Sequence, residues 1–228
     1  MPADANEIRR TLERLHEGRL IEIRAMEVPI GSNGRKYHCT VSGYFTDFQL
    51  AAEAAVKLET AGAPGIYTLL NEPHPGLLAR RPNQLEWGAD KCTSKNEIVS
   101  LCWSLIDLDV IRPTGISATD AEMKPAAEVG RQIRKLLEAD GLEVLRACSG
   151  NGYHLLVKFA EETEDSVEQM LASMDWMSAE FSIPGQVNVD ISVTKRAQLT
   201  KLYGTLVRKG HEVAGRRHRR SKLYENKS

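Results

Sequence analysis

The sequence predicts an α/β (α+β) protein, and three observations lead to this class. Stretches with helical spacing of apolar residues alternate along the chain with short runs of β-type spacing. Gly, Pro, Asn and Asp separate these stretches, and no internal repeat is present. The 228 residues are enough for one large domain or two small ones. We therefore expect an N-terminal α/β lobe over residues 1–95, a second lobe over 96–210 and a basic tail over 211–228.

The N-terminal lobe is expected to begin with a helix capped by Asp4 or Asn6, because apolar residues recur on one face as far as Gly18. Asp47 is placed to cap a second helix that ends at Gly62. The strands predicted for this lobe are LIEIRAMEV (20–28), KYHCTV (36–41) and IYTLL (66–70). A connector held by three prolines follows these strands.

The second lobe is predicted from a long apolar strand, LCWSLIDLDVI, followed by a helix whose capping pattern is TDAE (119–122). Pro125 falls inside this helix, so we expect either a start near Lys124 or a kink in the first turns. The remaining predicted elements are the strands EVLRACS (143–149), HLLVKF (154–159) and VNVDISV (187–193), and a helix that begins at Thr163 or Asp165.

Two acids interrupt the apolar strand of the second lobe. Side chains alternate along a strand, so Asp107 and Asp109 face the same side. Two neighbouring carboxylates repel each other, and a divalent cation between them makes the pair favourable. Hard oxygen ligands of this kind suit Mg²⁺ or Mn²⁺. Two solvated aspartates at a strand end remain the alternative.

A third acid, Asp190, lies between apolar residues in another short β run. Three such carboxylates are the usual set for two metal ions that serve phosphoryl transfer. The turn SGNGYH adds Ser149, Gly150, Asn151 and Gly152, whose backbone N–H groups can form a cradle for anionic oxygens, and His154, which can donate a hydrogen bond to phosphate. An ordinary hairpin turn with a surface histidine is the alternative.

The net charge of −1 hides a strong asymmetry along the chain. Ten Lys/Arg and a single acid, Glu212, lie between Lys195 and Lys222. Such a segment beside an acidic body indicates either a polyanion-binding edge or a solvated tail. The four cysteines lack CxxC spacing, so we expect reduced cytoplasmic thiols and no zinc site. We expect no membrane segment and no signal peptide.

The order of these motifs resembles the archaeo-eukaryotic primases, the primase–polymerase superfamily. The resemblance rests on LIDLDVIRPTGISATDAE, ACSGNGYHLL and VDISV…KLYGTLVRKG, and it extends from about Ser42 to Lys222. It is strongest from Leu105 to Gly210 and is closest to the bifunctional primase–polymerase domains of plasmids, phages and prophages. It implies an RRM-like catalytic lobe packed against the N-terminal α/β lobe.

The resemblance also implies roles for individual residues. Asp107, Asp109 and Asp190 would be catalytic and would hold two Mg²⁺ or Mn²⁺ ions, and His154 with the turn at 149–152 would bind the triphosphate. Lys201, and after it Arg208, would contact the nucleotide. Nucleic acid would be bound by Lys195, Arg196, Arg216, Arg217, Arg219 and Arg220. Gln198 stands where many relatives carry arginine, and because Gln lacks the charge, that phosphate contact is expected from a neighbour.

The activity implied is that of a DNA primase, a DNA polymerase or both, in the replication of a mobile element. Its substrates would be dNTPs or NTPs and a single-stranded DNA template with or without a primer. A helicase or helix-bundle domain absent from this chain is a further expected partner, and the basic tail is a possible start of a linker to it. We expect this domain to be needed more for starting a strand without a primer than for extending a primer.

Three other functions remain open from the residues. A metal-dependent nuclease needs the same carboxylates but no triphosphate cradle. An RRM-like module that binds nucleic acid without catalysis is the second; its sheet usually carries aromatic residues, whereas here aspartates would repel phosphate. A glycosyltransferase with a DxD motif is the third, and the histidine turn and the basic segment disfavour it.

Overall fold

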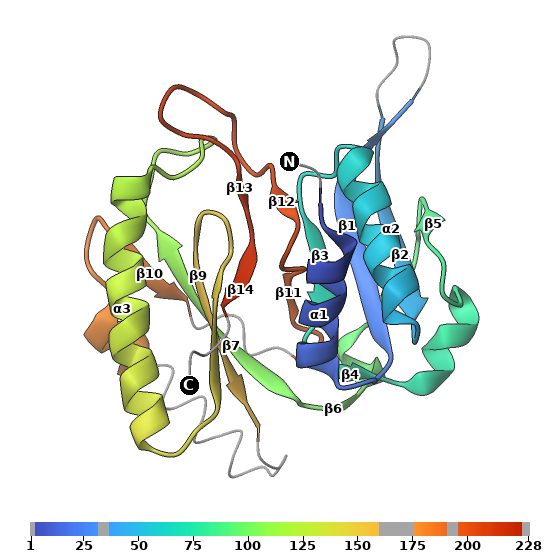
Figure 1. Cartoon of the computed structure of the whole chain (residues 1–228), viewed down its shortest axis with the longest axis horizontal. Helices are drawn as coiled ribbons and strands as arrows, with labels where there is room; N and C mark the ends of the chain where they lie inside the picture. Colours follow the sequence, from blue (N-terminus) through green and yellow to red (C-terminus); the bar gives the residue numbers. More distant parts are fainter. Residues whose placement is uncertain (1–2, 32–36, 160–175, 191–195, 225–228) are drawn as a thin grey trace. The chain divides into compact units, whose positions relative to one another are not determined.

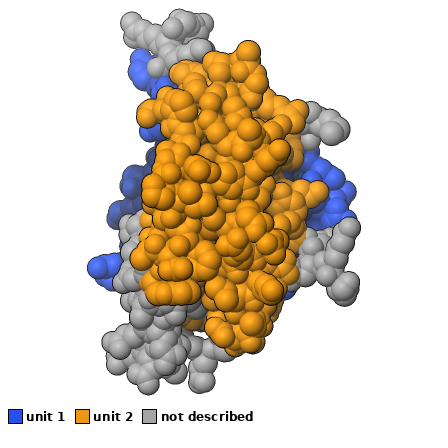
Figure 2. All heavy atoms as spheres, turned by 90° about the vertical axis from the view of Figure 1, so that its left-hand side faces the viewer, with its two compact units in different colours: residues 1–100, 196–208 blue, residues 101–195, 209–228 orange. Residues whose placement is uncertain are grey.

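The computed structural model describes residues 3–31, 37–159, 176–190 and 196–224. The chain forms two compact units, and each is built from two separate segments. Unit 1 consists of residues 1–100 and 196–208, and unit 2 consists of residues 101–195 and 209–228 (Figure 2). The expected first boundary, at 95, lies five residues before the end of the first segment of unit 1. Residues 196–208, which we expected in the second lobe, belong to unit 1, and the described tail residues belong to unit 2.

Unit 1 is a five-stranded antiparallel sheet with two helices on one face (Figure 1). The strand order is β11-β3-β1-β2-β5. Its main elements are α1 (Ala5–His16), β1 (Ile21–Ile30), β2 (Tyr37–Phe45), α2 (Phe48–Thr60), β3 (Ile66–Leu69), β5 (Glu86–Trp87) and β11 (Leu199–Lys201). The smaller elements are β4 (Glu72–Pro73), η1 (Pro75–Arg80), η2 (Lys95–Glu97), β6 (Ile98–Ser100) and β12 (Leu206–Val207).

The helices of unit 1 begin where the sequence predicts. Of the two possible caps, Asp4 is the one used, since its side chain accepts a hydrogen bond from the backbone of Asn6. Asp47 caps α2 in the same way. The apolar faces of both helices belong to one core with β1, whose residues Ile21 and Ile23 are fully buried. The connector after β3 contains the 3-10 helix η1, which the sequence pattern did not indicate.

Unit 2 contains the second sheet, in the order β10-β7-β9-β8-β14 (Figure 1). Its described strand pairs are all antiparallel. The elements are β7 (Trp103–Val110), α3 (Asp120–Ala139), β8 (Val144–Cys148), β9 (Gly152–Lys158), β10 (Val187–Asp190), β13 (Arg219–Arg220) and β14 (Lys222–Tyr224). Residues 176–181 are helical, and the start of the predicted helix at 163 or 165 lies outside the described residues.

The first four strands of unit 2 follow the β-α-β-β-α-β element order of RRM-like and ferredoxin-like sheets, with the spatial order 4-1-3-2. α3 covers one face of this sheet, where Ile106, Leu108 and Val110 of β7 are buried beside it. The helix begins at Asp120 with the expected capping box between Thr119 and Glu122, and it continues through Pro125. The start near Lys124, which we considered because of this proline, is wrong: the capping box satisfies the first backbone N–H groups.

Candidate functional site

The central strands of unit 2 place three of the predicted site residues side by side. Asp107 of β7 lies opposite Asp190 of β10 on one side and opposite His154 of β9 on the other. Residues 106, 108 and 110 point into the core under α3, so the odd-numbered aspartates face the opposite side of the sheet. We call Asp190, Asp107 and His154 the acidic row.

Asp109 lies two residues along β7 from the acidic row and on the same face. Its partners across the neighbouring strands are Asn188 and Gly152. The sheet therefore brings together, on one face, the four side chains that the sequence singled out from three separate motifs. The register of three strands produces this arrangement, since a shift by one residue would turn the side chains to the other face.

His154 is turned toward the carboxylates within this row. Its Nε2 atom lies 3.5 Å from Oδ1 of Asp107, and the residue is only 4% exposed. The sequence predicts either a surface histidine or a phosphate contact at this position. In the structure the imidazole is buried beside Asp107, where it can orient the carboxylate.

The electrostatic environment of Asp109 is unfavourable for its negative charge. Loss of water to the surrounding protein raises the pKa of Asp109, and the charges of Asp107 and Asp190 raise it further. A cation bound between the carboxylates would relieve the part of this effect that comes from the repulsion of Asp107 and Asp190. Lys209 and Arg112 act in the opposite direction and lower the pKa of Asp109.

The donor set of this face consists of hard carboxylate oxygens, which suit Mg²⁺ or Mn²⁺. Among the residues that the structure describes, however, no group of three or more His, Cys, Asp or Glu side chains is already arranged to hold a metal ion. The three carboxylates have the oxygen ligands that such an ion needs, and they lie on one face of the sheet. To share an ion, the carboxylates would have to rotate toward a common point.

Lys209 is a residue of this site that the sequence analysis missed. Its ammonium group is close enough to Asp109 to lower the pKa of that carboxyl, and the residue is exposed. From the segment VRKG the sequence predicts Arg208 as the cation that contacts the nucleotide. The structure places Arg208 in unit 1, where it donates a hydrogen bond to the carbonyl of Ala63. The chain crosses between the units at this point, so neighbouring residues belong to different units.

The glycine-rich turn between β8 and β9 is a closed hairpin turn. The Ser149 N–H donates to the Gly152 carbonyl, and the Gly150 N–H donates to Sγ of Cys148. These two amides are therefore not part of the open row of donors that we expected. Gly150 has a φ of 101°, which glycine adopts without strain. A Cβ at Gly152 would lie 2.5 Å from the Leu108 carbonyl oxygen, so the close approach of β9 to β7 requires glycine.

Asn151 joins three segments of unit 2. Its Oδ1 accepts a hydrogen bond from the Ala118 N–H, just before α3, and its Nδ2 donates to the Lys209 carbonyl. Both the oxygen and the nitrogen of the side-chain amide are hydrogen-bonded, so Asn151 holds the backbone of Lys209 near the turn. This role differs from the triphosphate contact that the resemblance implied.

The remaining predicted basic residues lie in several environments. Lys201, in unit 1, donates to the Tyr67 hydroxyl at 2.7 Å, and its ammonium lies 4.0 Å from the centroid of that ring. Arg196, also in unit 1, donates to the Ile98 carbonyl. Lys195 lies outside the described residues.

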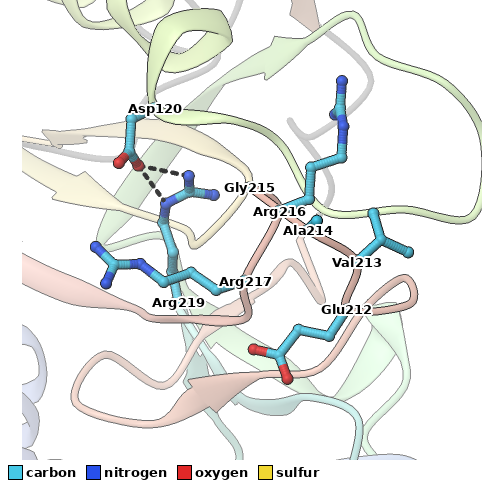
Figure 3. Close-up of a pocket in the computed structure, with 8 residues that line it drawn as sticks. All are labelled: Asp120, Glu212, Val213, Ala214, Gly215, Arg216, Arg217 and Arg219. Carbon is cyan, nitrogen blue, oxygen red and sulfur yellow. Dashed lines mark hydrogen bonds and ion pairs between the residues drawn. The ribbon is translucent and has the colours of Figure 1, made fainter.

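The arginines of the tail belong to unit 2, and two of them are held by acids of α3. Arg216 binds Glu122 through two hydrogen bonds of 2.8 and 2.7 Å. Arg219 binds Asp120, and Figure 3 shows this pair with the neighbouring side chain of Arg217. Arg217 is exposed and Arg220 is partly buried.

No protein-family model matches the chain, and no curated protein matches it. Among solved structures, the polymerase domain of Ligase D from Mycobacterium tuberculosis in complex with DNA aligns with 14% identity and a TM-score of 0.47. The alignment covers 86% of this chain and 73% of that one. These values describe a distant likeness of fold.

Each helix in the described segments is either too short or too polar to cross a bilayer.

Proposed function

We propose that this protein is a DNA-templated nucleotidyltransferase of the primase–polymerase type. The observation that carries this proposal is the register of β10, β7 and β9, which aligns Asp190, Asp107 and His154 in one row with Asp109 beside it. Four side chains from distant parts of the sequence share one face, and three of them are carboxylates. Neighbouring carboxylates that repel one another are typical of sites that bind divalent cations and phosphate.

The reaction is the attack of a 3′-hydroxyl oxygen on the α-phosphorus of a bound dNTP or NTP. A new P–O bond forms while the hydroxyl proton passes to solvent, the bond from the α-phosphorus to the α–β bridging oxygen breaks, and pyrophosphate leaves with its electron pair. Mg²⁺ or Mn²⁺ held by Asp107, Asp109 and Asp190 would supply the positive charge that this transfer needs. In this proposal His154 orients Asp107, and Lys209 attracts the triphosphate toward Asp109.

The supporting experiment is primer extension with purified protein, labelled dNTP and either Mg²⁺ or Mn²⁺. Asp107→Asn and Asp190→Asn should each reduce extension by about 100-fold or more, the order of loss seen when one electrostatic contact to a transition state is removed. The matched control is Asp140→Asn, which makes the same chemical change at the exposed end of α3 and should retain full activity.

The alternatives give different products in the same assay. A nuclease would shorten an end-labelled primer in the presence of metal without releasing pyrophosphate from dNTP. A binding module would shift the DNA in a gel without changing its length. Near-normal extension by Asp107→Asn would show that the carboxylates have been assigned wrongly. Parallel reactions with NTPs and without primer measure sugar preference and de novo priming.

A further inference from the structure

A second candidate surface lies on the α3 face of the sheet in unit 2, opposite the acidic row. Two adjoining hollows of about 640 and 520 Å³ share Asp120, Arg217 and Arg219 in their walls. The second hollow also reaches Tyr153, Lys222 and Tyr224. We call these six residues the arginine cleft, and Figure 3 shows its first hollow.

The arginine cleft carries more positive than negative charge. Asp120 is the acid among its six residues, and Arg219 neutralises this carboxylate, with Nη2 at 2.6 Å from Oδ1. The first hollow is also lined by Glu212 and Arg216, whose charges are opposite. Arg217 and Lys222 are both exposed, so they present their charges to solvent in the same hollow. The excess of cations favours a ligand that carries repeated negative charges.

The segment that carries these cations is fixed by hydrogen bonds from its arginines to residues at the start of α3. Arg216 forms its double hydrogen bond with Glu122 and also donates to the Ser117 carbonyl. Arg219 donates to the Ala118 carbonyl as well as to Asp120. Arg217 therefore lies in a segment braced on both sides, and less conformational entropy is lost when it binds a ligand.

Two tyrosine rings line the same hollow. The guanidinium of Arg146 lies 4.6 Å from the centroid of the Tyr224 ring, and Tyr224 itself lines the second hollow together with Tyr153. Burial raises the pKa of Tyr224 to about 12 and also raises the pKa of Tyr153. Both rings are therefore neutral at physiological pH and cannot repel a phosphate.

We propose that the arginine cleft binds single-stranded nucleic acid, with Arg217 and Lys222 on phosphates and Tyr224 against a base. Cations that follow a backbone, together with an aromatic platform, are the usual combination for single strands without sequence preference. This inference rests on the proposed function for its biological meaning, because it gives the template strand a surface distinct from the acidic row. The binding itself requires neither metal nor nucleotide.

The test measures fluorescence anisotropy of fluorescein-labelled oligo(dT) in EDTA over a series of salt concentrations. The double variant Arg217→Gln/Lys222→Gln should bind more weakly and reduce the slope of log Kd against log salt by about 1.4, since each lost contact to a single strand contributes about 0.7. The control double variant Arg131→Gln/Lys135→Gln removes the same charge from exposed positions of α3 and should leave the slope unchanged. Equal slopes for the two double variants would overturn the proposal.

A second pair of variants tests the aromatic contact. Tyr224→Leu should weaken oligo(dT) binding by about tenfold, within the range expected for one stacked base, and Tyr224→Phe should bind like the wild type. Inorganic phosphate and dTTP serve as competitors. If either competes as well as oligo(dT) at equal phosphate concentration, the cleft is an isolated phosphate site and the strand proposal is wrong.

These results separate the inference from the proposed function. Loss of binding in the cleft variants without any extension by the wild type would support a strand-binding cleft and contradict the polymerase proposal. Extension by the wild type with unchanged binding in the cleft variants would support the polymerase proposal and contradict the strand-binding cleft.

Discussion

Asp109 shows how a single residue can be unfavourable for folding and useful for a site. Its carboxylate lies beside Asp107 and near Asp190, and these charges contribute to raising its pKa. Groups whose charges oppose one another are common where a protein binds cations or phosphate. Lys209 and Arg112 only partly offset this repulsion.

Replacing Asp109 should therefore stabilise the metal-free protein. The raised pKa means that the folded state disfavours the ionised form, so the wild type loses stability as the pH rises through that pKa. Asp109→Asn should raise Tm at neutral pH by about 1–3 °C for a chain of this size, and the gain should disappear below about pH 4. Thermal melts in EDTA at several pH values measure this difference. A lower Tm for Asp109→Asn at neutral pH would contradict the repulsion.

The contact between the tail and α3 is the clearest example at the scale of elements. Arg216 lowers the pKa of Glu122 to about 2 through its hydrogen bonds, and the backbone N–H of Thr119 contributes to the same effect. Glu122 also completes the capping box of α3. One carboxylate thus fixes both the start of the helix and the path of the tail.

Arg216→Gln should lower the stability of unit 2. The pair contributes stability above the usual pKa of 4.5 for Glu122, and this contribution is lost as the pH falls through about 2. We expect Tm at neutral pH to fall by about 2–4 °C relative to the wild type. The further fall in Tm on acidification should be smaller in the variant than in the wild type. Arg131→Gln is the control, because its partner Glu128 lies on the exposed face of α3 and such pairs contribute little. Equal Tm changes for the two variants would contradict this account.

The long elements of the fold are predicted by the sequence because each carries its own periodic signal. The alternation around Asp107 predicts β7, and the pattern TDAE predicts the start of α3. The same alternation placed Asp107 and Asp109 on one face. β11, β13 and β14 have only two or three residues each. Such short strands contain no period to detect, and their positions depend on partners far along the chain.

The same reason explains which parts of the candidate site the sequence analysis missed. Lys209 and Arg208 are adjacent and both basic, so no local pattern distinguishes them. Only the path of the chain places Lys209 near Asp109 and Arg208 in unit 1. The role of Asn151 as a clamp likewise depends on Ala118 and Lys209, which are distant in sequence.

For the molecule as a whole, the main feature is that the chain passes between the units three times. After residue 195 it returns to unit 1, where β11 pairs with β3 and Leu202 is fully buried in the core. It then enters unit 2 again, where β14 pairs with β8. Each sheet thus includes an edge strand supplied by the C-terminal part of the sequence.

Truncation should therefore affect the two units in a defined order. A chain that ends at residue 208 retains unit 1 and lacks β14, so amide exchange should accelerate in β8 and stay slow in β3. A chain that ends at residue 195 lacks β11 as well, and exchange should accelerate in both strands. Hydrogen exchange followed by mass spectrometry measures both. Unchanged exchange of β3 in the shorter chain would show that β11 is not needed for unit 1.

The three passages between units also constrain how this protein can evolve. A single recombination event between two homologous genes, at any codon from 101 to 208, would give at least one sheet built from both parents. Neither unit can be exchanged intact unless several breakpoints occur together, because each unit consists of two separate segments. Divergence within this lineage is therefore expected to proceed by coordinated substitution rather than by shuffling of its halves.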